Sequence, residues 1–408
     1  MKYFLEMNFK QTLQTTHDSF YVYNEDNLVN NFNEFLKSFK LSYDNVEIAY
    51  SFKTNYLPEI CKKINDLGGI YEVVSEMELD LALKLENKKK IIFNGPYKTK
   101  EAIMKSLLND VIIHIDSLDE LNIISELLTS NEHINCNLGI RLNLSFASDS
   151  ISRFGICQSE IKKILKLISS NNRIELKGIS CHLPNRDLKS FEFRTKEIIK
   201  IYDFYFKNKI QYIDLGGGFP SILQEDLMNQ LKLKNTNIKE FAKKICSILN
   251  QYFNNSKIIK KPKLILEPGT ALVANTMSYY SKIISEKKIK NKIILSSSGS
   301  KFNFLGTNNS NLNFPFTEIL NPEFKSRKFR NVDIAGYTCI ENDYLLRNIS
   351  SSLIKGDYIK IEDIGSYSIV MKPPFISPNV PIFKVFENKI LELKRKETFQ
   401  DVFNTFLI

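Results

Sequence analysis

Cysteine and histidine are scarce in this chain. Only six cysteines occur in 408 residues, at positions 61, 136, 157, 181, 246 and 339, and no two of them form a CxxC pair. Scattered thiols of this kind argue against a disulfide framework and predict a reducing compartment, so we expect a cytoplasmic protein. Four histidines are too few for a histidine-rich metal centre, and we predict no metal site.

Long apolar runs are also missing. No stretch of about 18 apolar residues occurs, and the N-terminus lacks the apolar core and cleavage site of an export signal, so we expect neither a membrane span nor secretion. The formal charge of +10 comes from lysines spread along the chain, and no basic block is interleaved with aromatic residues. We therefore expect no nucleic-acid partner.

The segment 45–55 alternates as a β-strand does, and its two faces are unequal. One face is bulky and the other is small or polar, with Val46, Ile48, Tyr50 and Phe52 on the first and Glu47, Ala49, Ser51 and Lys53 on the second. This asymmetry suits a barrel wall, because helices cover the bulky face and small side chains fill the interior. Lys53 then lies at the inner, carboxyl end of the strand, where such barrels keep their chemistry. Taken alone, a lysine at a strand end more often extends to water.

Strand-like and helical segments alternate from residue 46 to residue 267. The strand-like segments fall near 46–52, 70–74, 90–94, 111–115, 136–143, 176–182, 211–215 and 263–267. Eight strands alternating with helices predict an α/β fold with a (β/α)8 barrel of the TIM type, and an open doubly wound sheet is the main rival. Beyond residue 270 short alternating runs dominate, including 367–371, and predict an all-β domain of the sandwich or Greek-key kind. We predict a barrel over residues 25–272 and a β domain from residues 1–24 and 273–408.

Four chemically unusual features stand at the ends of predicted barrel strands. Lys53 follows the first strand, His182 the sixth and Gly216–Gly218 the seventh, while Glu267 ends the eighth. The amides of the three glycines, joined by those of residues 269 and 270, are free to converge on a phosphate. Each feature alone has an ordinary alternative, such as a hydrogen-bonded structural histidine or a tight glycine turn.

Together, an amine, a flat imidazole, a phosphate cradle and a buried carboxylate match the needs of pyridoxal 5'-phosphate. On this interpretation Lys53 forms the Schiff base and His182 lies against the face of the ring. Gly216–Gly218 hold the phosphate, and Glu267 keeps the pyridine nitrogen protonated, which makes the ring a strong electron sink.

Eight motifs in order resemble the fold-type III pyridoxal-phosphate decarboxylases, the group of ornithine, arginine and diaminopimelate decarboxylases. The motifs are Tyr50-Ser-Phe-Lys-Thr-Asn55, Tyr71-Glu-Val-Val-Ser75, Asn94-Gly-Pro96, Ser152-Arg-Phe-Gly-Ile156, Asp214-Leu-Gly-Gly-Gly-Phe-Pro220, Glu267-Pro-Gly269, Gly336-Tyr-Thr-Cys339 and Gly356-Asp-Tyr358 with Gly365-Ser-Tyr367. They span roughly residues 19–380.

The resemblance implies a homodimer with active sites at the interface. Cys339 would come from the partner chain and reprotonate the carbanion left when CO2 departs. Tyr367 would touch the cofactor phosphate, and Arg141 would lie close to the Schiff-base lysine. Gly269 and Thr270 would complete the phosphate site.

Departures from the family pattern bear on the substrate, whose candidate contacts are Tyr337, Glu341 and Asp343. An acidic residue directly follows the cysteine in diamine-forming members, but Ile340 stands there in this chain. Residues 311–317 also lack the arginines that hold the distal carboxylate of diaminopimelate. His182-Leu-Pro-Asn185 replaces the family's His-x-Gly-Ser, and Thr270 replaces an arginine. These differences favour a less common substrate, such as an amino-acid conjugate in siderophore or natural-product synthesis, and a carrier protein would then be a partner.

Two other classes of function compete with decarboxylation. An amino-acid racemase shares the fold type but needs a second acid or base, commonly a tyrosine, on the opposite face of the ring. A non-catalytic relative tends to lose the lysine or the cysteine, and this chain has both. The motif around Cys339 favours decarboxylation.

Overall fold

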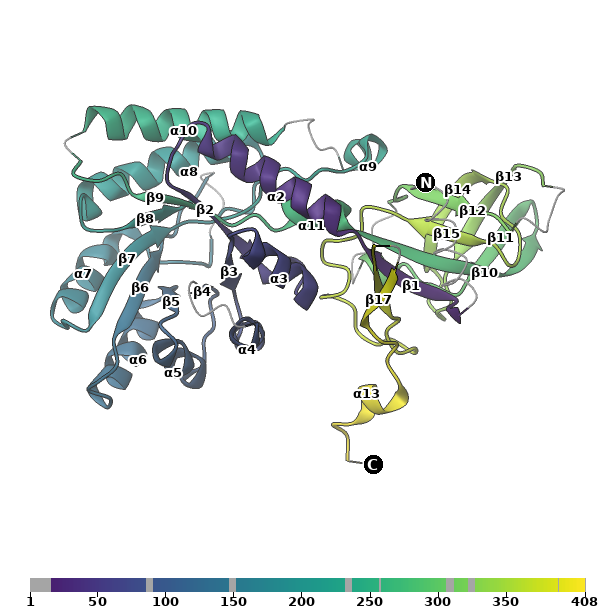
Figure 1. Ribbon diagram of the computed structural model, residues 1–408, viewed down its shortest axis with the longest axis horizontal. Helices are drawn as coiled ribbons and strands as arrows, with labels where there is room; N and C mark the ends of the chain where they lie inside the picture. Colours follow the sequence, from purple (N-terminus) through teal and green to yellow (C-terminus); the bar gives the residue numbers. More distant parts are fainter. Residues whose placement is uncertain are drawn as a thin grey trace. The chain divides into compact units, whose positions relative to one another are not determined.

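A computed structural model describes most of the chain. It covers residues 16–85, 91–146, 152–231, 237–256, 258–305, 312–321, 327–387 and 389–407. The chain divides into two compact units (Figure 1). The barrel unit comprises residues 29–221 and 236–271, and the sheet unit comprises residues 1–28, 222–235 and 272–408.

Eight parallel strands close into a barrel in the barrel unit. They are β2 (Val46–Ser51), β3 (Ile70–Val73), β4 (Ile91–Phe93), β5 (Ile112–Ile115), β6 (Cys136–Arg141), β7 (Ile174–Ser180), β8 (Tyr212–Asp214) and β9 (Lys263–Leu266). Each strand pairs with the next in the sequence, and β9 pairs with β2. The predicted strands and the closed barrel are confirmed, and the open sheet is excluded.

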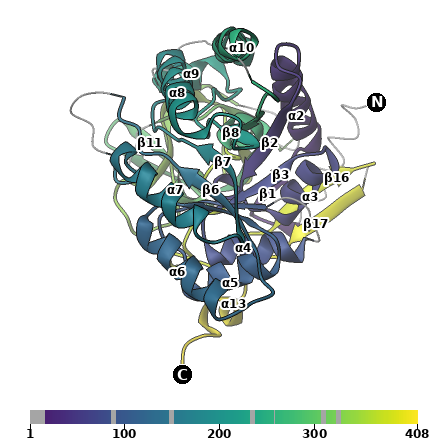
Figure 2. The same cartoon turned by 90° about the vertical axis from the view of Figure 1, so that its left-hand side faces the viewer.

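Helices surround this barrel (Figure 2). They are α2 (Glu25–Lys40), α3 (Pro58–Asp66), α4 (Glu76–Lys84), α5 (Lys100–Leu108), α6 (Leu118–Thr129), α7 (Ile161–Ser169), α8 (Leu188–Ile201) and α10 (Ile238–Asn255). Ser75 and Ser117 begin α4 and α6 by accepting the backbone N–H of the residue three positions on. These side chains satisfy amides that have no partner within the helix, which is why the two helices begin at these serines.

The interior of the barrel is packed by side chains from alternate strand positions. Ala49 lies in a buried cluster with Ile70, Ile92, Tyr212 and Ile265, which come from four other strands. The small face of the segment 45–55 therefore looks inward, as its alternation predicts. Because Lys53 lies two positions beyond Ser51 in a 3-10 turn (Phe52–Thr54), its side chain reaches the carboxyl end of the barrel.

The sheet unit is built mainly of β-strands. They are β1 (Ser19–Tyr23), β10 (Met277–Ile289), β11 (Lys292–Ser297), β12 (Phe316–Ile319), β13 (Arg330–Ala335), β14 (Tyr344–Ser351), β15 (Tyr358–Ile361), β16 (Ile382–Phe386) and β17 (Lys389–Lys394). Four short helices lie outside the barrel's ring, namely α9 (Glu225–Gln230), α11 (Thr270–Val273), α12 (Phe302–Leu305) and α13 (Phe399–Phe403). Strand β1 pairs with β10 and β16, so the N-terminal segment completes a sheet of C-terminal strands.

The sequence analysis did not predict three strands of the sheet unit, and one strand that it did predict is wrong. Residues 367–371 form a turn, because Tyr367 takes a left-handed backbone conformation with φ of 59°. Strand β14 was missed because Asn348 has φ of 52° and its pairing with β13 is shifted twice, which disrupts the alternation. Strands β12 and β16 were missed as well. Among the described residues no helix has the length and apolar character to cross a membrane.

Candidate active site

A cavity of about 280 Å³ opens at the carboxyl ends of the barrel strands. Its lining consists of Lys53, Glu72, Val74, Asn94, Gly95, Pro96, Arg141, Arg153, Phe154, Ser180, Cys181, His182 and Glu267. Four predicted site residues, Lys53, Arg141, His182 and Glu267, thus share one cavity. Strands far apart in the sequence deliver them because all strands of a parallel barrel end at the same rim.

Lys53 is held at the rim by a carboxylate that the sequence did not single out. Its Nζ donates to Oε2 of Glu72 over 2.7 Å, and Glu72, on β3, is only 1% exposed. Burial raises the pKa of Glu72, but the Lys53 ammonium and its hydrogen bond more than offset this and hold that pKa below its usual value. Glu72 is therefore an ionised partner for the amine. The sequence feature that could have identified Glu72 is an acidic residue at an inward-facing position of a short apolar strand.

Glu267 lies beside this pair and is itself buried. Its Oε1 accepts a hydrogen bond from Nδ2 of Asn94 over 2.6 Å, and its backbone N–H donates to the carbonyl of Gly216. Burial raises the pKa of Glu267, and the neighbouring Glu72 carboxylate adds to that rise. A carboxyl group whose pKa is raised in this way exchanges a proton readily near neutral pH.

His182 is neutral and oriented by the glycine turn after β8. The amide of Gly217 donates to Nδ1 of His182 over 3.0 Å, so the ring proton is on Nε2. Burial lowers the pKa of His182 well below its ordinary value, and the cations Lys53 and Arg194 lower it further. Gly216 has φ of 67°, and a Cβ there would lie 2.5 Å from the carbonyl oxygen of Cys181, so the turn requires glycine.

The glycine turn offers fewer free amides than its sequence suggests. The amide of Gly216 donates to Oδ1 of Asp214 over 2.7 Å, and that of Gly217 is taken by His182. Within the described part of the chain, the amide of Gly218 has no acceptor. The backbone amides predicted to bind phosphate are therefore reduced to that of Gly218 and those of Gly269 and Thr270 at the neighbouring strand end. Gly269 packs so closely on Thr54 that a Cβ would overlap its hydroxyl, which ties this turn to the one that carries Lys53.

Arg194, which the sequence analysis missed, lies beneath the turn. It is fully buried on α8, and Nη1 donates to the carbonyls of Leu215 and Gly217 at 3.0 and 2.9 Å. Nη2 donates to the carbonyl of Asn185 at 3.0 Å. Because Arg194 holds these backbone carbonyls on its own side of the glycine turn, backbone amides of the turn point to the opposite side. Arg194 stands at a position of α8 that the helical pattern assigns to the apolar, core-facing side. A cation at such a position is the sequence feature that could have identified it.

Arg141 carries its charge to the cavity wall. Its Nη1 donates to Oδ1 of Asp116 over 3.1 Å, and its guanidinium stacks on Phe154 with 4.6 Å between Cζ and the ring centroid. The guanidinium of Arg153 stacks on the same ring at 4.1 Å. Phe154 therefore keeps two cations at the cavity.

The other predicted site residues belong to the sheet unit. Cys339 and Glu341 are exposed in the turn after β13, Tyr337 is half-buried beside them, and Tyr367 is half-buried in the turn noted above. Asp343 is buried, and both its oxygens accept hydrogen bonds, from Ser300 over 3.0 Å and from Thr338 over 2.6 Å. We infer that Asp343 orients the Cys339 turn instead of contacting the substrate, because its buried oxygens are already engaged.

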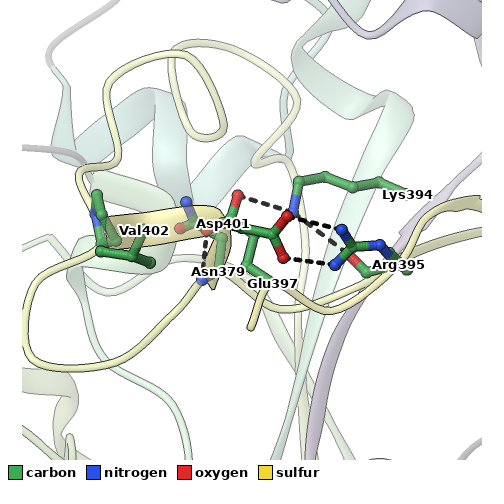
Figure 3. A pocket seen from close by; sticks show the side chains of 7 residues that line it. Asn379, Lys394, Arg395, Glu397, Asp401 and Val402 are labelled. Atoms are coloured by element: carbon green, nitrogen blue, oxygen red, sulfur yellow. Dashed lines mark hydrogen bonds and ion pairs between the residues drawn. The ribbon is translucent and has the colours of Figure 1, made fainter. Parts of the chain in front are cut away.

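A second cavity, of about 480 Å³, lies within the sheet unit (Figure 3). Its charges are paired with one another. Nζ of Lys394 lies 3.0 Å from Oε1 of Glu397, and Arg395 makes two hydrogen bonds to Asp401. These charges already satisfy each other at the surface of the sheet unit, whereas the cavity of the barrel unit places the Lys53 amine on a buried carboxylate.

The buried neutral state of His182 has a consequence for stability. The unfolded chain binds a proton on this histidine below about pH 6.5, whereas the folded chain does not, so acid favours unfolding. Relative to His182→Gln, whose amide oxygen can still accept from Gly217, the wild type is expected to lose up to about 1.4 kcal/mol of unfolding free energy per pH unit below pH 6.5. Denaturant titrations of both cofactor-free proteins between pH 7 and about pH 5 measure this. Equal pH slopes would contradict a neutral His182.

The residues of the barrel cavity fit pyridoxal phosphate. The cavity holds a lysine amine paired with a carboxylate, a neutral flat imidazole and a buried acid. At two adjacent strand ends stand backbone amides for which the described part of the chain supplies no acceptor. The glycine at position 216 cannot be replaced without a clash, so the turn is built for close approach.

Comparisons with known proteins agree with this chemistry. The family model described as "Pyridoxal-dependent decarboxylase, pyridoxal binding domain" matches residues 26–274. Diaminopimelate decarboxylase of Methanocaldococcus jannaschii is 27% identical, over 94% of this chain and 89% of its own length. The same-named protein of Aquifex aeolicus is 22% identical, over 96% and 92%.

Solved structures share the fold. A crystal structure of diaminopimelate decarboxylase from M. jannaschii has a TM-score of 0.84 at 21% sequence identity and covers 98% of this chain and 94% of that one. The family model spans more than half of the 408 residues. This chain therefore belongs to the pyridoxal-dependent decarboxylases and is a pyridoxal-phosphate-dependent carboxy-lyase that acts on an amino acid.

Proposed function

We propose that the barrel cavity decarboxylates a diamino acid of the diaminopimelate type, with Lys53 as the residue that holds the cofactor. The observation that carries the proposal is the contact of Lys53 with Glu72 and, through Asn94, with Glu267 inside one cavity. The relatives named above are diaminopimelate decarboxylases and align over at least 94% of this chain. They support this substrate class ahead of ornithine or arginine.

Each residue has a defined task in this proposal. Pyridoxal phosphate supplies an aldehyde that captures amines and a ring that accepts the electrons released with CO2. Glu72 takes or returns a proton at Nζ of Lys53, so that the amine can act as a nucleophile. Glu267 would hold a proton at the ring nitrogen, and the neutral imidazole of His182 would lie against the ring.

The remaining predicted residues complete the proposal. The amides of Gly218, Gly269 and Thr270 would bind the phosphate, and the hydroxyl of Tyr367 is proposed as a further phosphate contact. Arg141 keeps a positive charge at the cavity wall, and the thiol of Cys339 delivers the final proton to the substrate carbon. Tyr337 and Glu341 contact the distal end of the substrate.

A substrate panel tests the proposal. We expect CO2 release from meso-diaminopimelate to exceed that from L-ornithine or L-lysine by at least about tenfold, because its distal carboxylate matches the cations near the cavity and the other two amino acids have no such group. Citryl conjugates of diamino acids form a separate arm. Turnover of these conjugates alone would move the substrate to that class and favour a carrier-protein partner. Loss of the optical rotation of L-ornithine or L-lysine without CO2 release would replace decarboxylation by racemisation.

We further propose a homodimer in which Cys339 serves the cavity of the partner chain. Lys53→Ala and Cys339→Ala variants are each expected to be inactive as homodimers. Mixing them through reversible dissociation is expected to restore about a quarter of wild-type CO2 release, because half of the dimers are mixed and each mixed dimer has one intact site. A mixture that stays inactive, although native mass spectrometry shows mixed dimers, would place both residues in one chain's site.

A further inference from the structure

A buried chain of hydrogen bonds runs behind the two acidic residues of the cavity. It starts at Tyr212 on β8, passes through His114 on β5 and ends at Asn94, which follows β4. The hydroxyl of Tyr212 lies 2.6 Å from Nε2 of His114, and Nδ1 of His114 lies 2.8 Å from Oδ1 of Asn94. These side chains are at most 7% exposed.

Only one assignment of donors and acceptors satisfies all of these contacts. The two hydrogens on Nδ2 of Asn94 point to Oε1 of Glu267 at 2.6 Å and Oε1 of Glu72 at 3.2 Å. Oδ1 of Asn94 is then the acceptor toward His114, so Nδ1 of His114 carries the proton and Nε2 accepts from the Tyr212 hydroxyl. Burial, with the charges of Lys98 and Arg141, lowers the pKa of His114 to about 3, so the ring has a single proton.

The barrel makes room for this chain at two strand positions. A Cβ on Gly139, in β6, would overlap the imidazole of His114 and lie 2.7 Å from the Tyr212 hydroxyl. A Cβ on Gly178, in β7, would overlap the Tyr212 ring. Glycine weakens the interior of a strand, and there it commonly marks the close approach of another group. The space occupied by the imidazole and the phenol is therefore part of the barrel's construction.

We propose that Asn94, oriented by His114 and Tyr212, is a positioning residue that holds Glu267 in place for the ring nitrogen and couples it to the Glu72–Lys53 pair. This inference rests on the proposed function. An asparagine amide turned by 180° would present its oxygen to two carboxylates, which repel it. The proton on Nδ1 of His114 prevents that turn, and the Tyr212 hydroxyl keeps the proton on Nδ1.

The decisive variant is Tyr212→Phe, which removes one oxygen and retains the ring. In the holoenzyme loaded with ¹⁵N-labelled pyridoxal phosphate, we expect the ¹⁵N shift of the ring nitrogen to move toward that of an unprotonated pyridine. We expect kcat to fall about tenfold, which corresponds to the loss of roughly one hydrogen bond. KM should change less than about twofold, because Tyr212 lies behind the carboxylates.

Tyr43→Phe is the matched control, because the Tyr43 hydroxyl is also buried and donates to the carbonyl of Pro262 over 2.7 Å, away from the cavity. Its ring-nitrogen shift and kcat should equal those of the wild type. Asn94→Leu provides a second test and should move the same ¹⁵N shift further. Wild-type shifts in both Tyr212→Phe and Asn94→Leu would overturn the proposal. The shift is measured without substrate, so it decides the role of Asn94 even if the substrate assignment fails.

Discussion

Replacing Lys53 by alanine is expected to abolish turnover, with kcat at least about 10⁴-fold lower. Among the described residues that line the cavity, Lys53 carries the only primary amine, and only an amine can hold the cofactor aldehyde as a Schiff base. Burial raises the pKa of the neighbouring Cys181 thiol to about 12, so that thiol is a poor nucleophile. The purified variant should also lack the visible absorption of lysine-bound cofactor. CO2 release and absorption spectra of the same sample measure both effects.

Lys263→Ala is the matched control for this experiment. Lys263, on β9, pairs with Glu47 over 2.8 Å and is exposed to a similar degree as Lys53. It lies at the start of its strand, and therefore at the opposite end of the barrel from the cavity. The control should keep its colour and its activity. A Lys53→Ala protein that is coloured and active would end the assignment of this lysine. Lys53→Ala leaves the buried Glu72 carboxylate without its ammonium partner, which destabilises the fold. The double variant Lys53→Ala/Glu72→Gln removes this unpaired charge. If the double variant is folded and still inactive, the loss of activity does not come from unfolding.

Replacing Glu267 by glutamine is expected to lower kcat by about 10²-fold to 10³-fold. Glutamine fills the same space and can still accept from Nδ2 of Asn94, but it carries no charge to hold a proton on the ring nitrogen. A neutral ring withdraws electrons less strongly, so CO2 leaves more slowly. Cofactor should still bind, because Lys53 and the phosphate-binding amides are unchanged. Single-turnover CO2 release separates the slowed chemical step from binding.

Glu78→Gln is the control for Glu267→Gln. Glu78 is also buried, its pKa is raised to about 7 by burial, and its Oε2 accepts the amide of Val74 over 2.8 Å. Glutamine can make the same contact, and Glu78 does not line the cavity. Unchanged activity in Glu78→Gln beside a large loss in Glu267→Gln would assign the effect to the site. Equal losses in the two variants would instead point to the general cost of altering a buried acid.

Much of the barrel was predictable because its signals are local. The alternation of segment 45–55, the strands near 70–74 and 263–267 and the serine caps at 75 and 117 depend on neighbouring residues, and the structure confirms them. The sheet unit was less predictable. Positive φ values at Asn348 and Tyr367 interrupt the alternation there, and long-range pairing decides which short runs become strands.

The order of residues along the chain was enough to place Lys53, His182, Glu267 and the glycine turn at strand ends, because a parallel barrel brings every strand end to one rim. The sequence did not indicate which side chains contact one another across that rim. Glu72 holds the amine, Asn94 joins two carboxylates, and two of the three glycine amides are already taken. These facts follow from side-chain directions and distances between strands that are far apart in sequence, and only the packed barrel sets them.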